Sequence, residues 1–283
     1  MKCRFLNRLC ALLCVLMIAG TFALPVSAAC DHVFEKDQCT LCGQIGGTCG
    51  SNATWTFDPA TGVLLIEGSG TMSTYSTATT APWYPYRHEI KEAVMGGKVS
   101  SIGPYAFYDC SQMTGIYISK SVSNIYTSSF YKCDSLETFE LEAGANYSLD
   151  SQGILYNKKQ TYMIALPGGY SGVCEIPDSV VNVGPASENS NPFLYIQGIT
   201  EFRASENNTT FYTDDNGLLY TKNVSRLIAC PKSYTGNCLI PASVTKYEST
   251  AFNDCHGLTG IYVEEGNSSY SSTENGLLLF LPF

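Results

Sequence analysis

Apolar and polar positions along the chain follow a repeat of 23 residues. Val99–Cys110 places valine, isoleucine, an alanine–phenylalanine pair and cysteine at fixed spacing, and Val122–Cys133 repeats this order with serine for alanine. The pattern returns at Val244–Cys255, and a degraded copy runs from Val180 to Ile196, where isoleucine takes the cysteine position. Self-similarity at a fixed period of this length indicates a stacked-repeat architecture rather than a single globular core.

A short strand pattern begins three residues after each cysteine position, with apolar residues at its first, fourth and sixth places. The last three places alternate apolar and polar, which is typical of a strand with one buried face. A single coil cannot bury its apolar face, so the coils are expected to stack and each to add one strand to a parallel sheet. With a weaker upstream copy, the segments are 90–95, 113–118, 136–141, 199–204 and 258–263.

A second, longer unit is interleaved with these coils. Gly153–Val180 contains a Gly-x-Leu-Tyr segment, a later cysteine and an Ile-Pro pair, and the same order returns 64 residues later at Gly217–Val244. A third copy starts at Gly276 and is cut short by the C-terminus. Asn216-Gly217 and Asn275-Gly276 are hairpin turn dipeptides, because both residue types tolerate positive φ. We therefore expect a β-rich solenoid with a parallel strand face, inserted β-hairpins, an N-terminal β cap and little helix.

The repeat V-x-x-I-G-x-x-A-F-x-x-C-x-x-L-x-x-I-x-I resembles the BspA-type leucine-rich repeat of bacterial proteins. The resemblance covers about residues 49–283 and departs from the pattern at Ile196 and at an insertion before Phe193. It implies a secreted or surface-displayed bacterial protein that acts in adhesion and in host or glycan interaction, and it does not imply an enzyme. The residues upstream are similar to the leader of such arrays, with Thr54-Trp55-Thr56-Phe57, Gly68-Ser-Gly70 and Pro82-Trp83-Tyr84-Pro85.

The first 28 residues have the form of a secretory signal. Basic residues precede an apolar run, Leu9–Leu24, and Val26-Ser27-Ala28 supplies a small-residue cleavage site. The run is short for a membrane span and is not followed by basic residues, so we expect export with no membrane span in the mature chain. The protein is then secreted or extracellular, either free or associated with the cell surface. A lipid on Cys30 is an alternative, because Ala28-Ala29-Cys30 resembles the end of a lipobox.

The predicted domains are the signal peptide at 1–28, a Cys/His-rich leader at 29–47, the β cap at 48–89 and the solenoid at 90–283. The chain has 25 acidic and 16 basic side chains, and signal cleavage removes basic residues only. This acidic balance excludes nucleic acid as a binding partner, because its phosphates need a basic face on the protein. No nucleophile elbow, phosphate-binding loop or zinc-protease motif occurs, so we assign no catalytic residue. A glycan-active enzyme stays an alternative, because a carboxylate pair can assemble in the fold alone.

The leader holds a possible metal site. Cys30 and His32, followed by Cys39 and Cys42, are two close pairs that could form a tetrahedral Cys₃His zinc knuckle. Such a zinc would be structural, because four protein ligands leave no open position. Disulfide pairing or free thiols in an exported leader is the alternative.

The outward positions of the strand face form the candidate ligand-binding surface. Tyr117, Glu140, Arg203 and Tyr262 occupy the central outward place of four strands, and stacked strands lie about 4.8 Å apart. Aromatic side chains at such spacing can stack on sugar rings or anchor a peptide. We therefore expect a non-catalytic protein that binds a host or bacterial surface protein or glycan. One alternative is that the protein is a structural surface component that associates with itself. Another is that the four outward residues are ordinary solvated strand residues.

Other residues of the repeat are expected to be structural. The cysteine position of each coil is read as a buried thiol, with no disulfide between Cys110 and Cys133, whereas Cys230 and Cys238 could be bridged across a turn. Trp83 is expected to cover the first coil, with glycan stacking as its alternative. The phenylalanine column of the core is predicted to contain Phe107, Phe130, Phe193 and Phe252.

Overall fold

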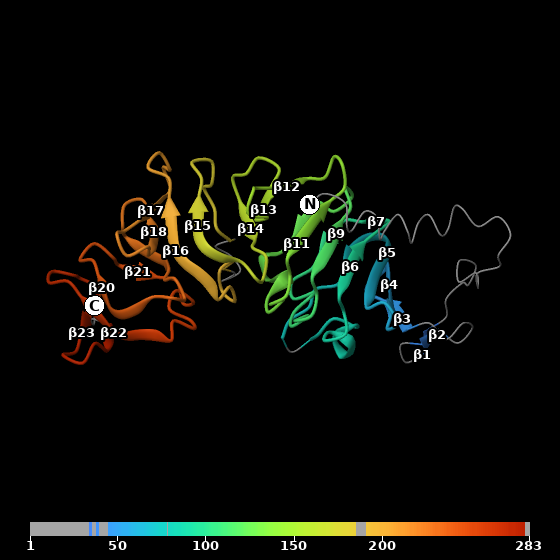
Figure 1. The fold of residues 1–283 in the computed structure, drawn as a ribbon, viewed down its shortest axis with the longest axis horizontal. Helices are drawn as coiled ribbons and strands as arrows, with labels where there is room; N and C mark the ends of the chain where they lie inside the picture. The colour runs from blue at the N-terminus through green and yellow to red at the C-terminus, as the bar shows by residue number, and fades with distance from the viewer. Residues whose placement is uncertain (1–33, 36–37, 40–44, 78, 185–190, 281–283) are drawn as a thin grey trace. The chain divides into compact units, whose positions relative to one another are not determined.

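The computed structural model describes residues 34–35, 38–39, 45–77, 79–184 and 191–280, and the chain divides into two compact units, Met1–Gln44 and Ile45–Phe283. In the first unit, strands β1 (Phe34–Glu35) and β2 (Gln38–Cys39) pair antiparallel. The second unit contains the repeats. Its described residues form strands and short 3₁₀ turns and no α-helix, so the predicted β-rich repeat solenoid is confirmed (Figure 1).

An antiparallel sheet precedes the coils. Strands β3 (Ile45–Thr48), β4 (Gly50–Asp58) and β5 (Val63–Met72) pair in sequence order. Apolar side chains alternate along β4 and β5, so that Trp55, Phe57, Leu64 and Ile66 are buried on one face. On its other edge β5 pairs parallel with β6 (Glu92–Met95) and β7 (Lys98–Val99). Strand β5 thus converts the antiparallel sheet into the parallel face of the repeats.

The short coils extend this face as the sequence predicts. Strands β6, β9 (Gly115–Ile118) and β11 (Thr138–Leu141) are parallel neighbours in register. A second ladder joins β8 (Ser101–Ile102) to β10 (Asn124–Ile125), where the valine–isoleucine segments of successive coils meet. The 3₁₀ turns are η2 (Tyr84–Tyr86) and η3 (Thr127–Phe130). Each coil therefore contributes a face strand, a corner and a return strand.

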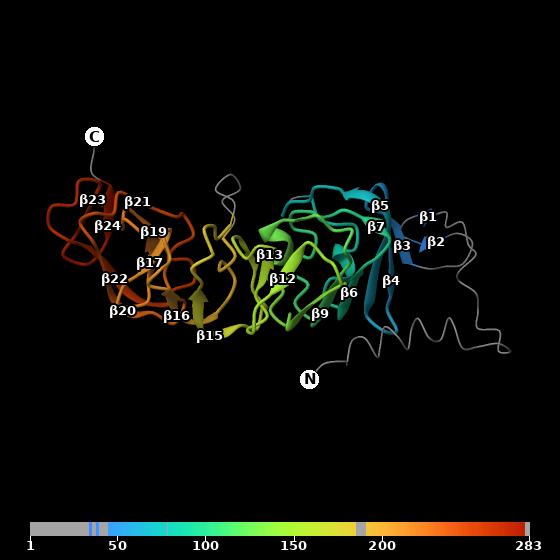
Figure 2. The same cartoon turned by 90° about the horizontal axis from the view of Figure 1, so that it is seen from above.

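The longer units contain hairpins, as expected, but they also contain a face strand that the sequence reading did not identify. Strands β15 (Ser171–Ile176) and β20 (Thr235–Ile240) pair parallel with β16 (Gly198–Ala204) and β22 (Gly257–Val263), so each long unit ends in a strand of the face (Figure 2). The first unit comprises β12 (Tyr147–Leu149), β13 (Leu155–Asn157), β14 (Met163–Ala165), β15 (Ser171–Ile176) and β16 (Gly198–Ala204). The second comprises β17 (Phe211–Thr213), β18 (Leu219–Thr221), β19 (Arg226–Ala229), β20 (Thr235–Ile240), β21 (Lys246–Tyr247) and β22 (Gly257–Val263). The third hairpin joins β23 (Tyr270–Ser272) to β24 (Leu278–Phe280).

A buried asparagine fastens each later hairpin to the coil before it. Asn208 is 1% exposed; its Nδ2 donates to the carbonyls of Pro177 (2.7 Å) and Val180 (3.0 Å). Its Oδ1 accepts from the N–H groups of Thr210 and Phe211, both at 2.8 Å. Asn267 makes the same four hydrogen bonds one unit later, to Pro241, Val244, Ser269 and Tyr270. We call this arrangement the asparagine clamp.

The hairpin turns are held by a second polar device. Asp214 Oδ1 accepts hydrogen bonds from the N–H groups of Asn216 and Leu218, and Oδ2 accepts one from the Tyr220 hydroxyl. Asp150 has the same role in the first hairpin, with Ile154 and Tyr156. Burial is the main cause that raises the pKa of Asp214. These two carboxylates therefore stabilise the hairpin turns.

The core confirms most of the predicted structural residues. Phe107 and Phe130 are stacked with ring centroids 5.7 Å apart, and Phe193 is also buried, but Phe252 is only half-buried. Trp83 is buried completely and donates from Nε1 to the Ala106 carbonyl at 2.8 Å, so it is a core residue and not a stacking platform. The seven cysteines of the described second unit are buried free thiols, so Cys230 and Cys238 are not bridged in the structure. No described helix is long and apolar enough to cross a membrane.

Candidate binding face

Four residues on neighbouring parallel strands lie in one cross-strand row. The ladders place Leu65 opposite Val94, Val94 opposite Tyr117 and Tyr117 opposite Glu140. We call these four residues the face row. Each is partly exposed, whereas neighbours such as Ile116 beside Tyr117 and Phe139 beside Glu140 are buried in the core. Figure 1 shows β6, β9 and β11 side by side, so the row crosses adjacent strands of one continuous sheet.

Glu140, at the end of the face row, and the nearby Glu142 have different electrostatic surroundings. Burial, followed by the nearby Glu92 carboxylate, raises the pKa of Glu140. In contrast, the backbone N–H and the ammonium of Lys120 both bind the Glu142 carboxylate at 2.9 Å, and these bonds lower the pKa of Glu142. Within the described residues no cation forms an ion pair with Glu140. Glu140 is therefore a carboxylate that an arriving cation can neutralise.

Tyr117 lies between the apolar and the acidic parts of the row. It has Val94 on one side and Glu140 on the other. Burial, and then the Glu142 carboxylate, raise the pKa of its hydroxyl, so Tyr117 is neutral and can donate a hydrogen bond at physiological pH. The row thus offers two aliphatic side chains, a phenol and a carboxylate in sequence.

Arg203 and Tyr262, the other two predicted residues, lie on separate pieces of the face. Arg203 stands opposite Glu175 on β15, and its guanidinium forms ion pairs with Glu175 at 3.1 Å and Glu201 at 2.9 Å. Tyr262 stands opposite Leu239 on β20, and its hydroxyl donates to the Glu274 carbonyl at 3.4 Å. Among the described residues, no ladder joins β11 to β15 or β16 to β20. The structure therefore brings Tyr117 and Glu140 together and does not add Arg203 or Tyr262 to the same ladder.

Two outward residues that sequence reasoning missed are Glu175 and Leu239. Both belong to the unpredicted face strands, and Leu239 is 53% exposed. The signal was present in the alternation of Gly172, Cys174 and Ile176, whose later two members are buried. That alternation has the period of a strand. Because the segment directly follows a hairpin pattern, it was assigned to the hairpin.

The predicted zinc ligands are not described as a site. Cys30, His32 and Cys42 lie outside the described residues, and Cys39 is described only as a backbone position of β2. No group of three candidate ligands occurs among the side chains that the structure describes. The zinc knuckle stays a prediction, and elemental analysis of residues 29–283 tests it, since a zinc-free preparation would contradict it.

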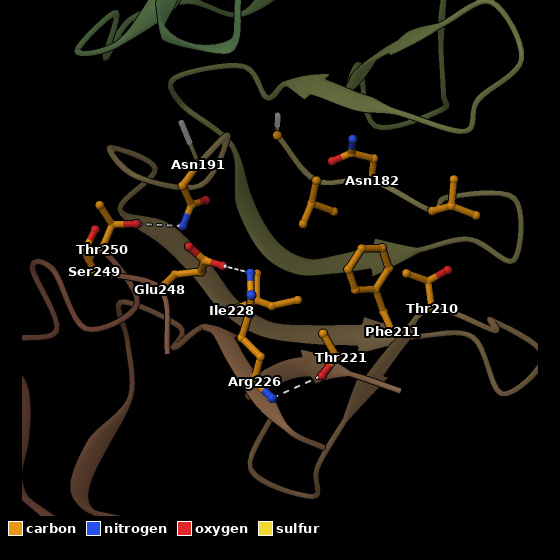
Figure 3. A pocket seen from close by; sticks show the side chains of 13 residues that line it. Asn182, Asn191, Thr210, Phe211, Thr221, Arg226, Ile228, Glu248, Ser249 and Thr250 are labelled. Carbon is orange, nitrogen blue, oxygen red and sulfur yellow. Dashed lines mark hydrogen bonds and ion pairs between the residues drawn. The ribbon is translucent and has the colours of Figure 1, made fainter. Parts of the chain in front are cut away.

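A cavity of about 210 Å³ lies between the hairpin β17–β19 and the coils on either side of it (Figure 3). Arg226 and Glu248 form an ion pair of 3.0 Å at its wall, and Asn191 donates to the Thr250 hydroxyl at 3.2 Å. Phe211 supplies buried apolar surface. The cavity is smaller than the roughly 300–1,000 Å³ of usual small-molecule sites, and its two opposite charges neutralise each other. It is therefore a weaker candidate than the face row.

A serine, a histidine and an aspartate also meet on the surface. His88 Nδ1 lies 3.1 Å from Ser111 Oγ, and His88 Nε2 lies 3.8 Å from Asp109 Oδ2. Asp109 is bound more closely by Arg87, at 2.9 Å. A catalytic triad needs an aspartate hydrogen-bonded to the histidine, in a site that also stabilises an oxyanion. The distance and the exposure of His88 do not meet this requirement, so the geometry assigns no nucleophile here.

Comparisons with known proteins identify the repeat and a similar fold. Residues 84–182 match the sequence profile of the BspA type leucine rich repeat region in 6 copies. No curated protein sequence matches the chain. A leucine-rich repeat protein from Eubacterium ventriosum has a similar structure, with a TM-score of 0.53 and 22% identity, over 79% of this chain and 60% of that one. This similarity supports a shared fold.

Two further solved structures align more loosely. The pneumococcal vaccine antigen PcpA has a TM-score of 0.39 and 15% identity, over 77% of this chain and 64% of that one. A leucine rich cell surface protein from Faecalibacterium prausnitzii has a TM-score of 0.29 and 16% identity, over 84% of this chain and 61% of that one. This chain thus spans less than two thirds of each of these proteins.

Proposed function

Because this chain carries BspA-type leucine-rich repeats, we propose that it is a secreted, non-catalytic binding protein whose face row contacts a protein or glycan of a host or bacterial surface. Proteins with such repeats are generally binding proteins without catalytic activity. The observation that carries the proposal is the register of Leu65, Val94, Tyr117 and Glu140 on adjacent parallel strands. A partly exposed row of this kind suits adhesion, which is the biological role that we propose.

The chemistry of the face row supports a protein partner in particular. Interface hot spots combine a tyrosine anchor with apolar neighbours that exclude water. Tyr117 beside Val94 and Leu65 has this composition. Glu140 and Glu92 add negative charge at the edge, which favours a lysine or arginine of the partner over an uncharged sugar. The strands are held by backbone ladders, so little ordering is needed on binding.

The binding test uses labelled residues 29–283 on an array of mucin glycans, plant polysaccharides and extracellular-matrix proteins. We expect saturable binding to a protein with a basic segment. Tyr117→Ser should weaken that binding at least about fivefold, since hot-spot truncation exceeds about 1 kcal/mol. Tyr212→Ser is the matched control, because Tyr212 is 40% exposed on hairpin strand β17 and outside the face row.

Three results would contradict the proposal. The first is equal binding by Tyr117→Ser and the unaltered chain. The second is an equal loss in Tyr212→Ser, which would locate the contact elsewhere. The third is a blank array combined with concentration-dependent oligomers in light scattering, which would support a self-associating structural component instead.

A further inference from the structure

Two thiols from consecutive coil corners meet inside the last part of the repeat. Cys230 follows β19, and Cys255 is the cysteine of the next corner, so 25 residues separate them. The Cys230 N–H donates to the Ala251 carbonyl at 2.9 Å, which fixes the two segments side by side. Cys255 Sγ lies 3.8 Å from the Cys230 carbonyl oxygen and 3.6 Å from that of Pro231. The two thiol groups also lie close enough for each to shift the pKa of the other.

We propose that Cys230 and Cys255 are a redox-active pair that a small-molecule disulfide converts into a disulfide bond joining the two coils. An exported chain would meet such oxidants, because disulfides form and persist outside the cytosol. The proposal does not depend on the binding function.

The surroundings of the pair assign different roles to the two sulfurs. The neighbouring Cys230 thiol, together with the Lys232 ammonium, lowers the pKa of Cys255, although burial and Asp254 oppose this. The neighbouring Cys255 thiol, and then burial, raise the pKa of Cys230. Lys232 is held near by donating from Nζ to the Asn253 carbonyl. Cys255 is also the more exposed thiol, at 8% against 2%.

The chemistry proceeds by two thiol–disulfide exchanges. The Cys255 thiolate attacks one sulfur of the small disulfide, an S–S bond breaks, and one small thiolate leaves with the bonding electron pair. The Cys230 thiol then loses its proton and attacks the Cys255 sulfur of the mixed disulfide, which releases the second small thiolate. The two protons of the cysteines end on the two small thiols. The protein pair is oxidised, and the small disulfide is reduced.

The repeat itself supplies two comparisons. In the preceding long unit the equivalent positions are Leu166 and Ile196, an apolar pair that cannot be oxidised in this way. Cys110 and Cys133 occupy the cysteine position of successive short coils, but Cys133 Sγ donates to the Phe107 carbonyl at 3.0 Å. Burial raises the pKa of both these thiols. They should therefore stay reduced under conditions that oxidise Cys230 and Cys255.

The experiment incubates folded residues 29–283 with glutathione disulfide and maps the peptides by mass spectrometry without reduction. We expect a peptide pair joined through Cys230 and Cys255 and no bridge between Cys110 and Cys133. The melting temperature should rise by roughly 5–10 °C on oxidation, as expected for a bond closing a loop of this size. Cys230→Ser should accumulate a glutathione adduct on Cys255, whereas Cys238→Ser should form the bond as the unaltered chain does.

Three outcomes would overturn the proposal. A bond between Cys230 and Cys238 would show that the neighbouring thiol resolves the pair. A lasting glutathione adduct, or no reaction while the denatured chain reacts fully, would show that the pair is inert in the fold. Should a serine variant fail to fold, the double change Cys230→Leu and Cys255→Ile copies the preceding unit. That variant must fold and lose both the cross-link and the rise in melting temperature.

Discussion

Replacement of Asn208 by alanine tests whether the asparagine clamp holds the repeat together. Asn208 is buried and makes four hydrogen bonds, two to carbonyls of the preceding segment and two from N–H groups of its own loop. Alanine leaves two acceptors and two donors without partners at a buried position. Each lost bond corresponds to about 1 kcal/mol, so the free energy of unfolding should fall by about 3–5 kcal/mol.

The assay is urea unfolding followed by circular dichroism, with Asn207→Ala as the matched control. Asn207 is the preceding residue and is exposed, so its replacement should change the free energy by less than about 0.5 kcal/mol. A loss below about 1 kcal/mol for Asn208→Ala would refute the reasoning, because it would mean that the loop satisfies its polar groups without the side chain. The first hairpin has Ala145 at the equivalent position and uses Asn146, whose Nδ2 donates to the carbonyls of Lys120 and Val122.

Asn208→Asp tests the direction in which the stability of the folded state changes with pH. The aspartate loses both Nδ2 donors and places a carboxylate against the carbonyls of Pro177 and Val180. Burial and this repulsion should raise its pKa in the folded state above that of the unfolded chain. The folded state then binds the proton more tightly, so the stability deficit is smallest at acid pH and grows as pH rises through the folded-state pKa. A deficit that shrinks with rising pH would contradict the clamp geometry.

Three further outcomes are expected. Phe130→Ala should destabilise by about 3–5 kcal/mol in urea unfolding and Phe252→Ala by less, because Phe252 is half-buried; equal losses would contradict the core assignment. In carboxyl NMR titration, Glu140 should titrate above its ordinary range and Glu142 below, and the reverse order would refute the charge arrangement of the face. Gly217→Ala should lower the melting temperature, because φ is +74° and a Cβ would lie 2.7 Å from the Glu201 side chain.

The short coils could be predicted from the sequence because each has a single local signal. Ile116 and Ile118 alternate with Tyr117, and the same pattern recurs at the period of one coil. A period-two pattern next to a fixed corner leaves one way to stack the strands. The pairing of Tyr117 with Glu140 follows from that register and is what the structure has.

The long units were harder to predict because their pairings depend on distant residues. Cys174 and Cys238 lie in strands β15 and β20, yet the local sequence reads equally well as the end of a hairpin. Asn208 resembles any loop asparagine until the carbonyls it binds, at Pro177 and Val180, are placed beside it. The contact of Cys230 with Cys255 likewise appears only when two corners stack, since Cys238 is nearer in sequence.

The asparagine clamp has a consequence for how such a gene can change in length. Asn208 and Asn267 each bind the carbonyls of a proline and a valine in the unit before them, which lie 31 and 28 residues upstream in the first copy and 26 and 23 residues upstream in the second. Unequal recombination between the copies that adds or deletes a full period preserves every donor and acceptor, wherever the breakpoint falls. The loop between the carbonyls and the clamp tolerates a shorter insertion as well, because the first copy is longer there than the second and keeps all four hydrogen bonds. Recombination by full periods should therefore add or remove face strands in pairs through the long unit, and singly through the 23-residue coil, whereas an insertion within the loop should leave the number of face strands unchanged.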